Sequence, residues 1–126
     1  MMKTIALNSA ALAAASLLAH GAAFAQSDTS RGAKLFEECR ACHTTDAGVH
    51  LVGPSLRGVV GRKSGTLDDF RYSPAMKRAD IVWTRQTLDA FIADPQGIVP
   101  ANRMPFSGIP DAKSRAAVIE YLQTLK

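Results

Sequence analysis

Two cysteines and a histidine stand close together in residues 36–45, which read FEECRACHTT. Cys39 and Cys42 are three positions apart, and His43 follows the second cysteine directly. Thiols and an imidazole at such short spacing have several common uses: a disulfide, a zinc site, or the covalent attachment of a haem. Other features of the sequence distinguish among these chemistries.

Covalent haem attachment accounts for the spacing of these residues. Two thiols would bond to the two vinyl groups on neighbouring edges of a porphyrin, and one helical turn spans them. The imidazole of His43 would then lie beneath the iron as its proximal ligand. Cys39, Cys42 and His43 therefore predict a c-type haem, because C-x-x-C-H is the attachment motif of that cofactor.

Zinc and a disulfide are the alternatives. With His50, these residues would supply two thiolates and two imidazoles, which is enough for a zinc ion. However, His43 directly beside Cys42 crowds a tetrahedral site, and the usual zinc finger places its histidines well beyond the cysteines. A disulfide between Cys39 and Cys42 would close only a very short loop and would stabilise the fold little.

The first 25 residues have the pattern of a secretory signal peptide. Lys3 gives a short positive start, a run of small and apolar residues follows, and Ala23-Phe24-Ala25 forms a processing site. An uncleaved membrane anchor is disfavoured because polar residues interrupt the run, and no later segment is apolar enough to span a membrane. We expect cleavage after Ala25, export to the periplasm, and a single domain over residues 26–126.

The mature chain is mildly basic, with 14 Lys and Arg against 11 Asp and Glu once Lys3 is removed with the signal. This balance suits an acidic protein partner or a membrane surface. Nucleic acid is disfavoured because the chain has no basic run and few aromatic side chains that could stack on bases. We therefore expect partners with acidic surfaces and no nucleic acid.

Helical patterns separated by glycine-rich loops cover the mature chain. The expected helices run from Asp28 or Ser30 towards Cys39, over residues 74–79, from Thr84 to Ala93, and onward from Pro110-Asp111. The last of these should bury a stripe made of Val118, Tyr121, Leu122 and Leu125. Because no segment alternates with a period of two, the fold class is all-α. The loop over residues 44–71 is long enough to indicate a function, such as wrapping around a ligand.

A haem iron held by His43 has a second face that needs a ligand. The mature chain offers two methionines, Met76 and Met104. Met104 lies in the segment VPANRMPF, where two prolines stiffen the loop that would hold a weak thioether against the iron. We therefore expect His43 and Met104 as axial ligands, an arrangement that leaves no open position and suits electron transfer.

Four further segments resemble the class I c-type cytochromes, especially soluble bacterial and mitochondrial-type cytochrome c, in order and spacing. They are GPSLRGVVGRKSG, FRYSPAMK, the block from Trp83 to Met104, and GIPDAKSRAAVIEYLQ. The resemblance covers essentially the whole mature chain. It implies a cytochrome c fold of three to five helices, with long loops wrapped around one haem c attached through Cys39 and Cys42.

The resemblance also assigns roles to residues around the haem. The carbonyl of Pro54 would accept the Nδ1 proton of His43, which orients the ring. Arg62, Tyr72 and Trp83 would donate hydrogen bonds to the haem propionates. The implied haem-binding set is Cys39, Cys42, His43, Pro54, Arg62, Tyr72, Trp83, Met104 and Phe106, with Leu56 packed against the ring.

Outside the haem, the resemblance makes Gly32 of the first helix a point of close approach to the last helix, and His50 a brace between loops. Met76 departs from the family, since many relatives have a polar residue there near a propionate. That residue also gives the iron a second conceivable thioether ligand.

The function implied is that of a periplasmic one-electron carrier, not an enzyme, working as a monomer with redox protein partners. Two alternatives stay open: a dedicated cytochrome subunit of a dehydrogenase or oxidase complex, and a ligand-binding sensor with a labile Met104. Five cations are expected around the exposed haem edge, where they would attract acidic partners: Lys34, Arg40, Arg57, Arg103 and Lys113.

Overall fold

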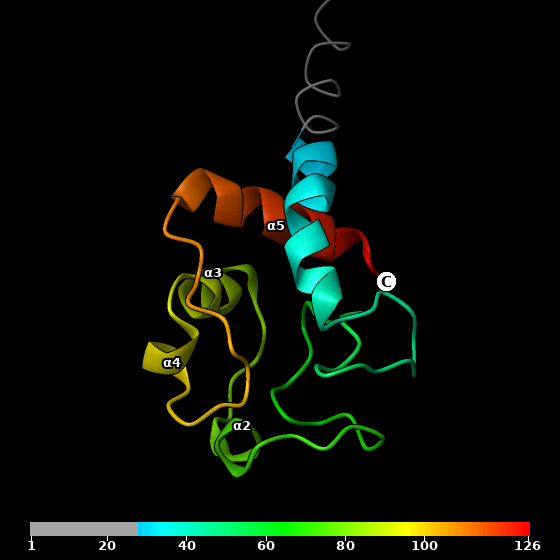
Figure 1. Ribbon diagram of the computed structural model, residues 1–126, viewed down its shortest axis with the longest axis vertical. Coiled ribbons are helices and arrows are strands. Elements are labelled where there is room, and N and C mark those ends of the chain that lie inside the picture. Colours follow the sequence, from blue (N-terminus) through cyan, green and yellow to red (C-terminus); the bar gives the residue numbers. More distant parts are fainter. Residues whose placement is uncertain (1–27) are drawn as a thin grey trace, which may run out of the picture.

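The computed structural model describes residues 28–126, in which long loops join the helices (Figure 1). Residues 28–35 are helical and continue into the 3₁₀ helix η1. The remaining elements are η1 (Phe36–Ala41), α2 (Pro74–Arg78), α3 (Arg85–Ala93), α4 (Pro95–Ile98) and α5 (Ala112–Thr124). The predicted signal peptide lies outside the described residues.

The all-α prediction is confirmed. Over residues 28–126 the extended pairing is limited to one isolated antiparallel bridge, between Lys63 and Val82. No helix in this part of the chain is both long and apolar enough to cross a membrane.

Side-chain caps fix where the helices begin, as the sequence predicted for two of them. Thr84 accepts a hydrogen bond from the backbone of Thr87, whose own side chain reaches back to complete a capping box. Asp111 caps α5 by accepting from the backbone N–H of Ser114. Ser73 caps α2 in the same way. These polar side chains satisfy N–H groups that have no partner inside the helix.

The sequence pattern predicts a loop over residues 97–108, and this is wrong for its first two residues, which belong to α4. Asp94 ends α3 and at once caps a second short helix, α4, by accepting from the N–H of Gly97. Pro95 occupies the first turn of α4, where its missing N–H costs nothing. The same Asp-Pro pair therefore ends one helix and begins the next.

The first helix crosses α5, and Gly32 makes the crossing possible (Figure 1). A Cβ atom on Gly32 would lie 1.9 Å from the carbonyl oxygen of Ala117, so only glycine fits there. Below this point the ring of Phe36, which is fully buried, lies 5.1 Å from the ring of Tyr121. The close helix contact expected from the sequence is confirmed.

The buried face of α5 includes residues that the predicted stripe left out. Val118 and Leu122 are buried as expected, but Ala117 and Ile119 are buried too, at 3% and 1% exposure. The helix ends at Thr124, and Leu125 is its C-cap. α5 is covered on two sides, by the first helix and by α3, so its apolar face is wider than one stripe.

Replacing Gly32 with alanine is expected to destabilise the protein by about 2–3 kcal/mol, because the added methyl group meets backbone that cannot rotate away. The measurement is denaturant-induced unfolding of the haem-containing protein. Ala116→Ser, at an exposed position of α5, serves as the control and should change stability by less than about 0.5 kcal/mol. Equal effects of the two substitutions would refute the proposed close crossing.

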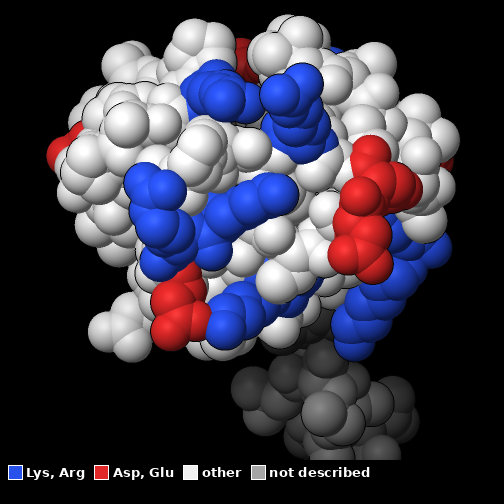
Figure 2. Space-filling model, turned by 90° about the horizontal axis from the view of Figure 1, so that it is seen from below, with Lys and Arg blue, Asp and Glu red and all other residues white. Residues whose placement is uncertain are grey.

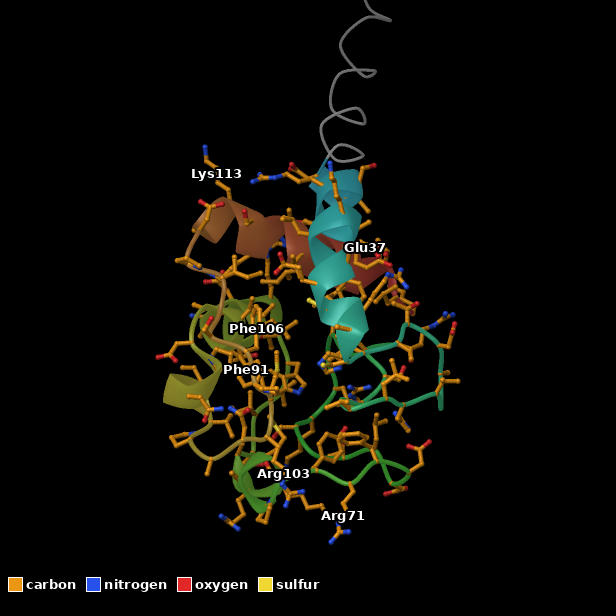
Figure 3. All side chains as sticks on the ribbon, viewed as in Figure 1. Glu37, Arg71, Phe91, Arg103, Phe106 and Lys113 are labelled. Carbon is orange, nitrogen blue, oxygen red and sulfur yellow. The ribbon has the colours of Figure 1, made fainter. Side chains whose placement is uncertain are left out.

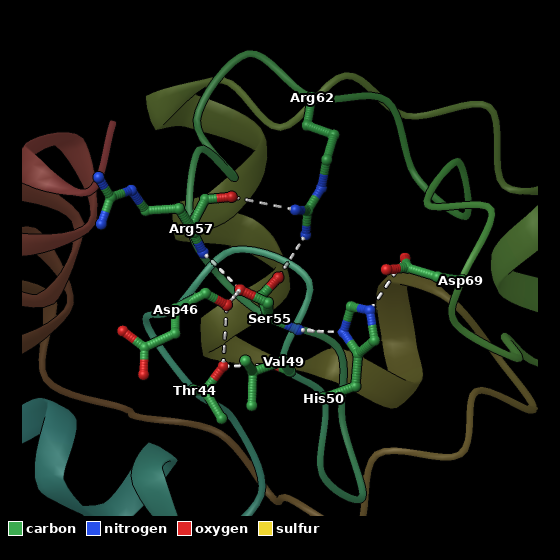
Figure 4. Close-up of polar contacts among 8 residues, drawn as sticks. All are labelled: Thr44, Asp46, Val49, His50, Ser55, Arg57, Arg62 and Asp69. Atoms are coloured by element: carbon green, nitrogen blue, oxygen red, sulfur yellow. Dashed lines mark hydrogen bonds and ion pairs between the residues drawn. The ribbon is translucent and has the colours of Figure 1, made fainter.

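A hydrogen-bonded network holds the long loop after His43 in place (Figure 4). The Ser55 hydroxyl donates to the Asp46 carbonyl at 2.6 Å, and the Ser55 backbone N–H donates to His50 Nδ1 at 2.9 Å. His50 Nε2 lies 2.9 Å from Asp69 Oδ1, on a different part of the loop. His50 therefore joins two loop segments, which is the bracing role the sequence suggested.

Candidate cofactor site

A cavity of about 380 Å³ lies at the centre of the molecule, between η1 and the loop that follows α4. All nine predicted haem-binding residues line it: Cys39, Cys42, His43, Pro54, Arg62, Tyr72, Trp83, Met104 and Phe106. Side chains of the core, among them Phe36, Leu88 and Val118, close its inner wall. The volume falls within the range of pockets that hold small-molecule cofactors.

The attachment motif forms a tight turn at the end of η1. The backbone N–H groups of Cys42 and His43 both donate to the carbonyl of Cys39, at 3.1 and 2.9 Å. Both thiols are free and half-buried, so Cys39 and Cys42 do not form a disulfide in this structure. Burial, helped by the carboxylate of Glu38, raises the pKa of the Cys39 thiol. The turn thus presents two free thiols and an imidazole towards the same cavity.

The zinc alternative fails on the same geometry. Within residues 28–126 no three His, Cys, Asp or Glu side chains gather closely enough to hold a metal ion. His50, the fourth ligand that zinc would need, accepts from the Ser55 N–H at Nδ1 and lies beside Asp69.

His43 is held in one orientation and one tautomer. Its Nδ1 lies 2.7 Å from the carbonyl oxygen of Pro54, which can only accept, so Nδ1 carries the proton. The lone pair of Nε2 remains available for a metal ion. Burial lowers the pKa of His43, the bond to Pro54 opposes that shift, and the charge of Arg62 lowers the pKa further. The balance favours the neutral imidazole that a metal ligand needs.

Gly53 lets the imidazole of His43 lie directly against the loop. A Cβ atom at position 53 would lie 2.3 Å from Cε1 of His43 and 2.7 Å from its Nδ1. The adjacent Gly53 N–H donates to the carbonyl of Cys42 at 2.8 Å. The loop therefore clamps the histidine from its backbone side, a contact that the glycine-rich sequence suggested only in general terms.

Met104 is positioned by a buried asparagine that the sequence analysis missed. Asn102 is 8% exposed, and its Nδ2 donates to the carbonyls of Pro95 and Val99, each at 2.9 Å. Its Oδ1 accepts from the backbone N–H of Met104 at 2.8 Å. A polar residue between the prolines of VPANRMPF was the available signal, because a buried amide must find several partners.

The polar end of the cavity brings together Arg62, Tyr72 and Trp83. The Arg62 guanidinium donates to the carbonyls of Ser55 and Arg57, at 3.1 and 3.3 Å (Figure 4). Burial lowers the pKa of Arg62 and raises that of Tyr72. Trp83 is 6% exposed and lies 4.9 Å from the ring of Phe91, so it belongs to the core as well as to the cavity wall.

Met76 lines the same cavity as Met104. It projects from α2 and is half-buried, and its backbone N–H donates to the Ser73 hydroxyl. Two thioethers therefore line one cavity, so Met76 is a second candidate for the axial ligand beside Met104.

The five cations expected around the haem edge are not grouped there. Of Lys34, Arg40, Arg57, Arg103 and Lys113, only Arg103 lines the cavity. Arg40 is paired with Glu37 and also donates to the Tyr121 hydroxyl. Figure 3 shows Lys113 at the upper end of the molecule and Arg103 at the lower end. The sequence alone does not fix the face of the fold on which each of these side chains emerges.

The donor set fits a covalently bound iron porphyrin. Two free thiols, an imidazole with an available Nε2 and two thioethers all line a cavity whose walls are otherwise mostly apolar. Guanidinium, phenol and indole groups at one end suit the two carboxylates that such a ring carries.

Comparisons with known proteins agree with this geometry. The cytochrome c family model matches residues 29–126. Cytochrome c2 of Rhodopila globiformis is 47% identical over 100 residues, which cover 79% of this chain and 94% of that protein. Cytochrome c2 iso-2 of Magnetospirillum fulvum is 46% identical over 90 residues, covering 71% and 94%. The solved structure of cytochrome cH from Methylobacterium extorquens superposes with a TM-score of 0.74 at 40% identity, covering 77% of this chain and 98% of that one.

Proposed function

Because the chain belongs to the cytochrome c family, we propose that it is a periplasmic one-electron carrier whose axial ligands are His43 and Met104. The cofactor is haem c, attached through Cys39 and Cys42. An electron-carrying role follows from the family. The single observation that carries the finer proposal is that one cavity is lined by both cysteines, by His43 and by Met104.

Bound in this cavity, haem c supplies an iron that takes up and gives back one electron. The carbonyl of Pro54 holds the His43 proton on Nδ1, which leaves Nε2 free to bind the iron and would make it a better donor. Asn102 holds the backbone of Met104 and so keeps its thioether in place. Two protein ligands leave no position for oxygen or substrate, which is why we propose a carrier and not an enzyme.

The polar end of the cavity suits the haem propionates. Arg62 remains charged even when partly buried, and its guanidinium would offset the negative charge of a carboxylate. The hydroxyl of Tyr72 and the indole N–H of Trp83 would donate hydrogen bonds that a buried carboxylate requires. Phe106 would cover the haem edge through which electrons pass.

Periplasmic location rests on the signal pattern of residues 1–25, and a monomeric state is proposed with it. Potentiometric titration of the mature protein tests the carrier proposal: a single reversible one-electron step is expected. A titration that needs more than one electron, or turnover of a substrate by the purified protein, would refute it.

Gel filtration of native extract separates the free carrier, which elutes at its own small mass, from a subunit of a larger complex.

Replacing Asn102 with alanine is expected to loosen Met104 without removing it. The carbonyls of Pro95 and Val99 would each lose one of two donors and keep a backbone N–H, and the Met104 N–H would lose its acceptor, at a cost of about 1–3 kcal/mol. Exogenous imidazole should then displace Met104 at lower concentration, as read from the absorption spectrum of the oxidised protein. Gln96→Ala, which removes only a 3.3 Å bond to the Asn102 carbonyl, is the matched control. Unchanged imidazole affinity in the Asn102 variant would exclude this positioning role.

A further inference from the structure

The long loop after His43 exposes a cluster of large apolar side chains. Val49, Leu51 and Val52 are 48%, 53% and 70% exposed, and they fall within four consecutive residues. In the described part of the chain, the other large apolar side chains with comparable exposure are Val82 and Ile98, which stand singly. The three clustered residues are called here the apolar loop. Neighbouring exposed apolar side chains of this size are typical of surfaces that bind another molecule.

The apolar loop is fixed in place before any partner binds. The hydroxyl of Thr44 donates to the carbonyl of Val49 (Figure 4), and the N–H of Leu51 donates to the carbonyl of Gly53 at 3.1 Å. His50, between the exposed residues, keeps its side chain only 13% exposed. A surface that is already ordered loses little conformational entropy when a partner covers it. The loop therefore holds its apolar side chains outward as a preformed contact surface.

One end of the apolar loop reaches the cofactor cavity. Val52 lines the cavity, and the next residue, Gly53, lies against the imidazole of His43. Val49 and Leu51 do not line the cavity, so they can be changed without altering its wall. A protein seated on the apolar loop would touch the cavity edge through Val52.

Carboxylates border the apolar loop. In residues 41–56, Asp46 is the one Asp, Glu, Lys or Arg, and the exposed Asp68 and Asp69 come from a neighbouring loop segment that contacts this one. Figure 4 shows Asp46 and Asp69 to either side of the loop, whereas the side chain of Arg57 is directed towards α5. By contrast, Lys and Arg side chains gather over the centre of the end that carries α2 (Figure 2). The apolar loop is thus an apolar surface with an acidic border.

We propose that the apolar loop docks a protein whose surface is apolar at its centre and edged by Lys or Arg side chains. The inference rests on the proposed carrier function, since contact with Val52 brings the partner beside the cofactor. Covering the three side chains removes apolar surface from water, which favours association. Basic groups at the edge would face Asp46, Asp68 and Asp69, an arrangement of apolar core and polar rim that protein interfaces share. This partner is opposite in charge to the one that the net charge of the chain suggests.

A protein partner fits the apolar loop better than a membrane or a second copy does. Segments that bind membranes combine apolar side chains with basic ones that contact anionic headgroups, whereas residues 41–56 contain no Lys or Arg. In a symmetric pair of this chain the same surface would face itself. The carboxylates of Asp46 and Asp69 would then meet their own copies, and like charges oppose association.

The test compares two double variants of the haem-containing protein that lose matched apolar side chains. Val49→Gln/Leu51→Gln changes the apolar loop, and Val82→Gln/Ile98→Gln changes side chains that are 47% and 43% exposed elsewhere. Each is titrated with an amphipathic helical peptide of leucine and lysine. The loop variant should bind this peptide about tenfold more weakly, and the control variant no more than about twofold. Binding by the unaltered protein should persist at about 0.5 M salt, because apolar contacts are not screened.

A third variant tests the acidic border. Asp46→Asn/Asp68→Asn leaves Asp69 beside His50 and should weaken peptide binding about threefold at low salt and not at high salt. Tighter binding by this variant would overturn the basic edge of the proposed partner. A further measurement needs no substitution: amide chemical shifts of the unaltered protein should move over residues 46–53 when the peptide is added, and shifts confined to other segments would overturn the proposal.

Three other outcomes would also overturn it. Equal weakening in the two apolar variants would mean that any exposed apolar side chain suffices. Binding to phosphatidylcholine vesicles that the loop variant loses, by a protein that ignores the peptide, would assign the loop to a membrane. A dimer in sedimentation that the loop variant loses would assign it to a second copy. A protein that cycles one electron normally but ignores the peptide counts against this inference alone, whereas failure to cycle counts against the carrier proposal.

Discussion

A Met104→Ala variant is expected to bind carbon monoxide rapidly once reduced, whereas the unaltered protein should leave it unbound. Removing the thioether opens one face of the iron, and a reduced haem with an open position takes up such ligands. Because methionine ligation raises the potential, the variant should also be harder to reduce. The expected drop is on the order of 0.2 V, within the roughly 0.8 V that axial ligands control.

Met76→Leu is the matched control for this prediction, since leucine keeps an apolar side chain of similar volume in the cavity wall. It should remain closed to carbon monoxide and keep its potential nearly unchanged. The reverse pattern, in which Met76→Leu opens the iron and Met104→Ala does not, would make Met76 the ligand. Both variants are compared by the same absorption spectra.

Cys39→Ser/Cys42→Ser is expected to abolish covalent haem and, with it, most of the folded protein. Acid-acetone extraction should release all haem from any protein recovered, whereas haem in Met104→Ala should resist extraction. Serine keeps the size of the side chain but supplies no thiol to form the bond. Haem that still resists extraction from the double variant would contradict attachment through these residues.

The loss of fold follows from the size of the cavity. Without haem, the apolar side chains that line this space of about 380 Å³ would face water, and burying one such side chain is worth about 1.5–3 kcal/mol. Total stabilities of small domains are only about 5–15 kcal/mol. Circular dichroism of the haem-free chain should therefore show little cooperative unfolding. A cooperative, fully helical spectrum would mean that the long loop packs without the cofactor.

The parts of the fold that sequence predicts well are those fixed by local chemistry. Thr84 and Asp111 begin their helices because a side-chain oxygen satisfies nearby N–H groups, and this requires only neighbours in sequence. The attachment motif is local as well, because the turn that brings Cys39, Cys42 and His43 together is formed by adjacent backbone. The resemblance to class I cytochromes supplied the more distant partners, such as Pro54.

What the sequence analysis missed depends on contacts between distant segments. Ile119 and Ala117 are buried because α5 is covered from two sides, which its own periodicity cannot reveal. Asn102 acts through carbonyls that α4 brings to it, and α4 was itself read as loop. The grouping of cations failed for the same reason: Lys113 and Arg103 emerge at opposite ends of the folded chain.

The central claim is that His43 and Met104 close the iron of a covalently held haem. The measurement that tests it most directly is the absorption spectrum of the mature protein, produced with haem-maturation machinery, reduced and then exposed to carbon monoxide. The expected result is a red protein whose reduced spectrum carbon monoxide leaves unchanged. Rapid formation of a carbon monoxide complex would contradict it, because Met104 would then not hold the iron and the protein would act as a ligand-binding sensor.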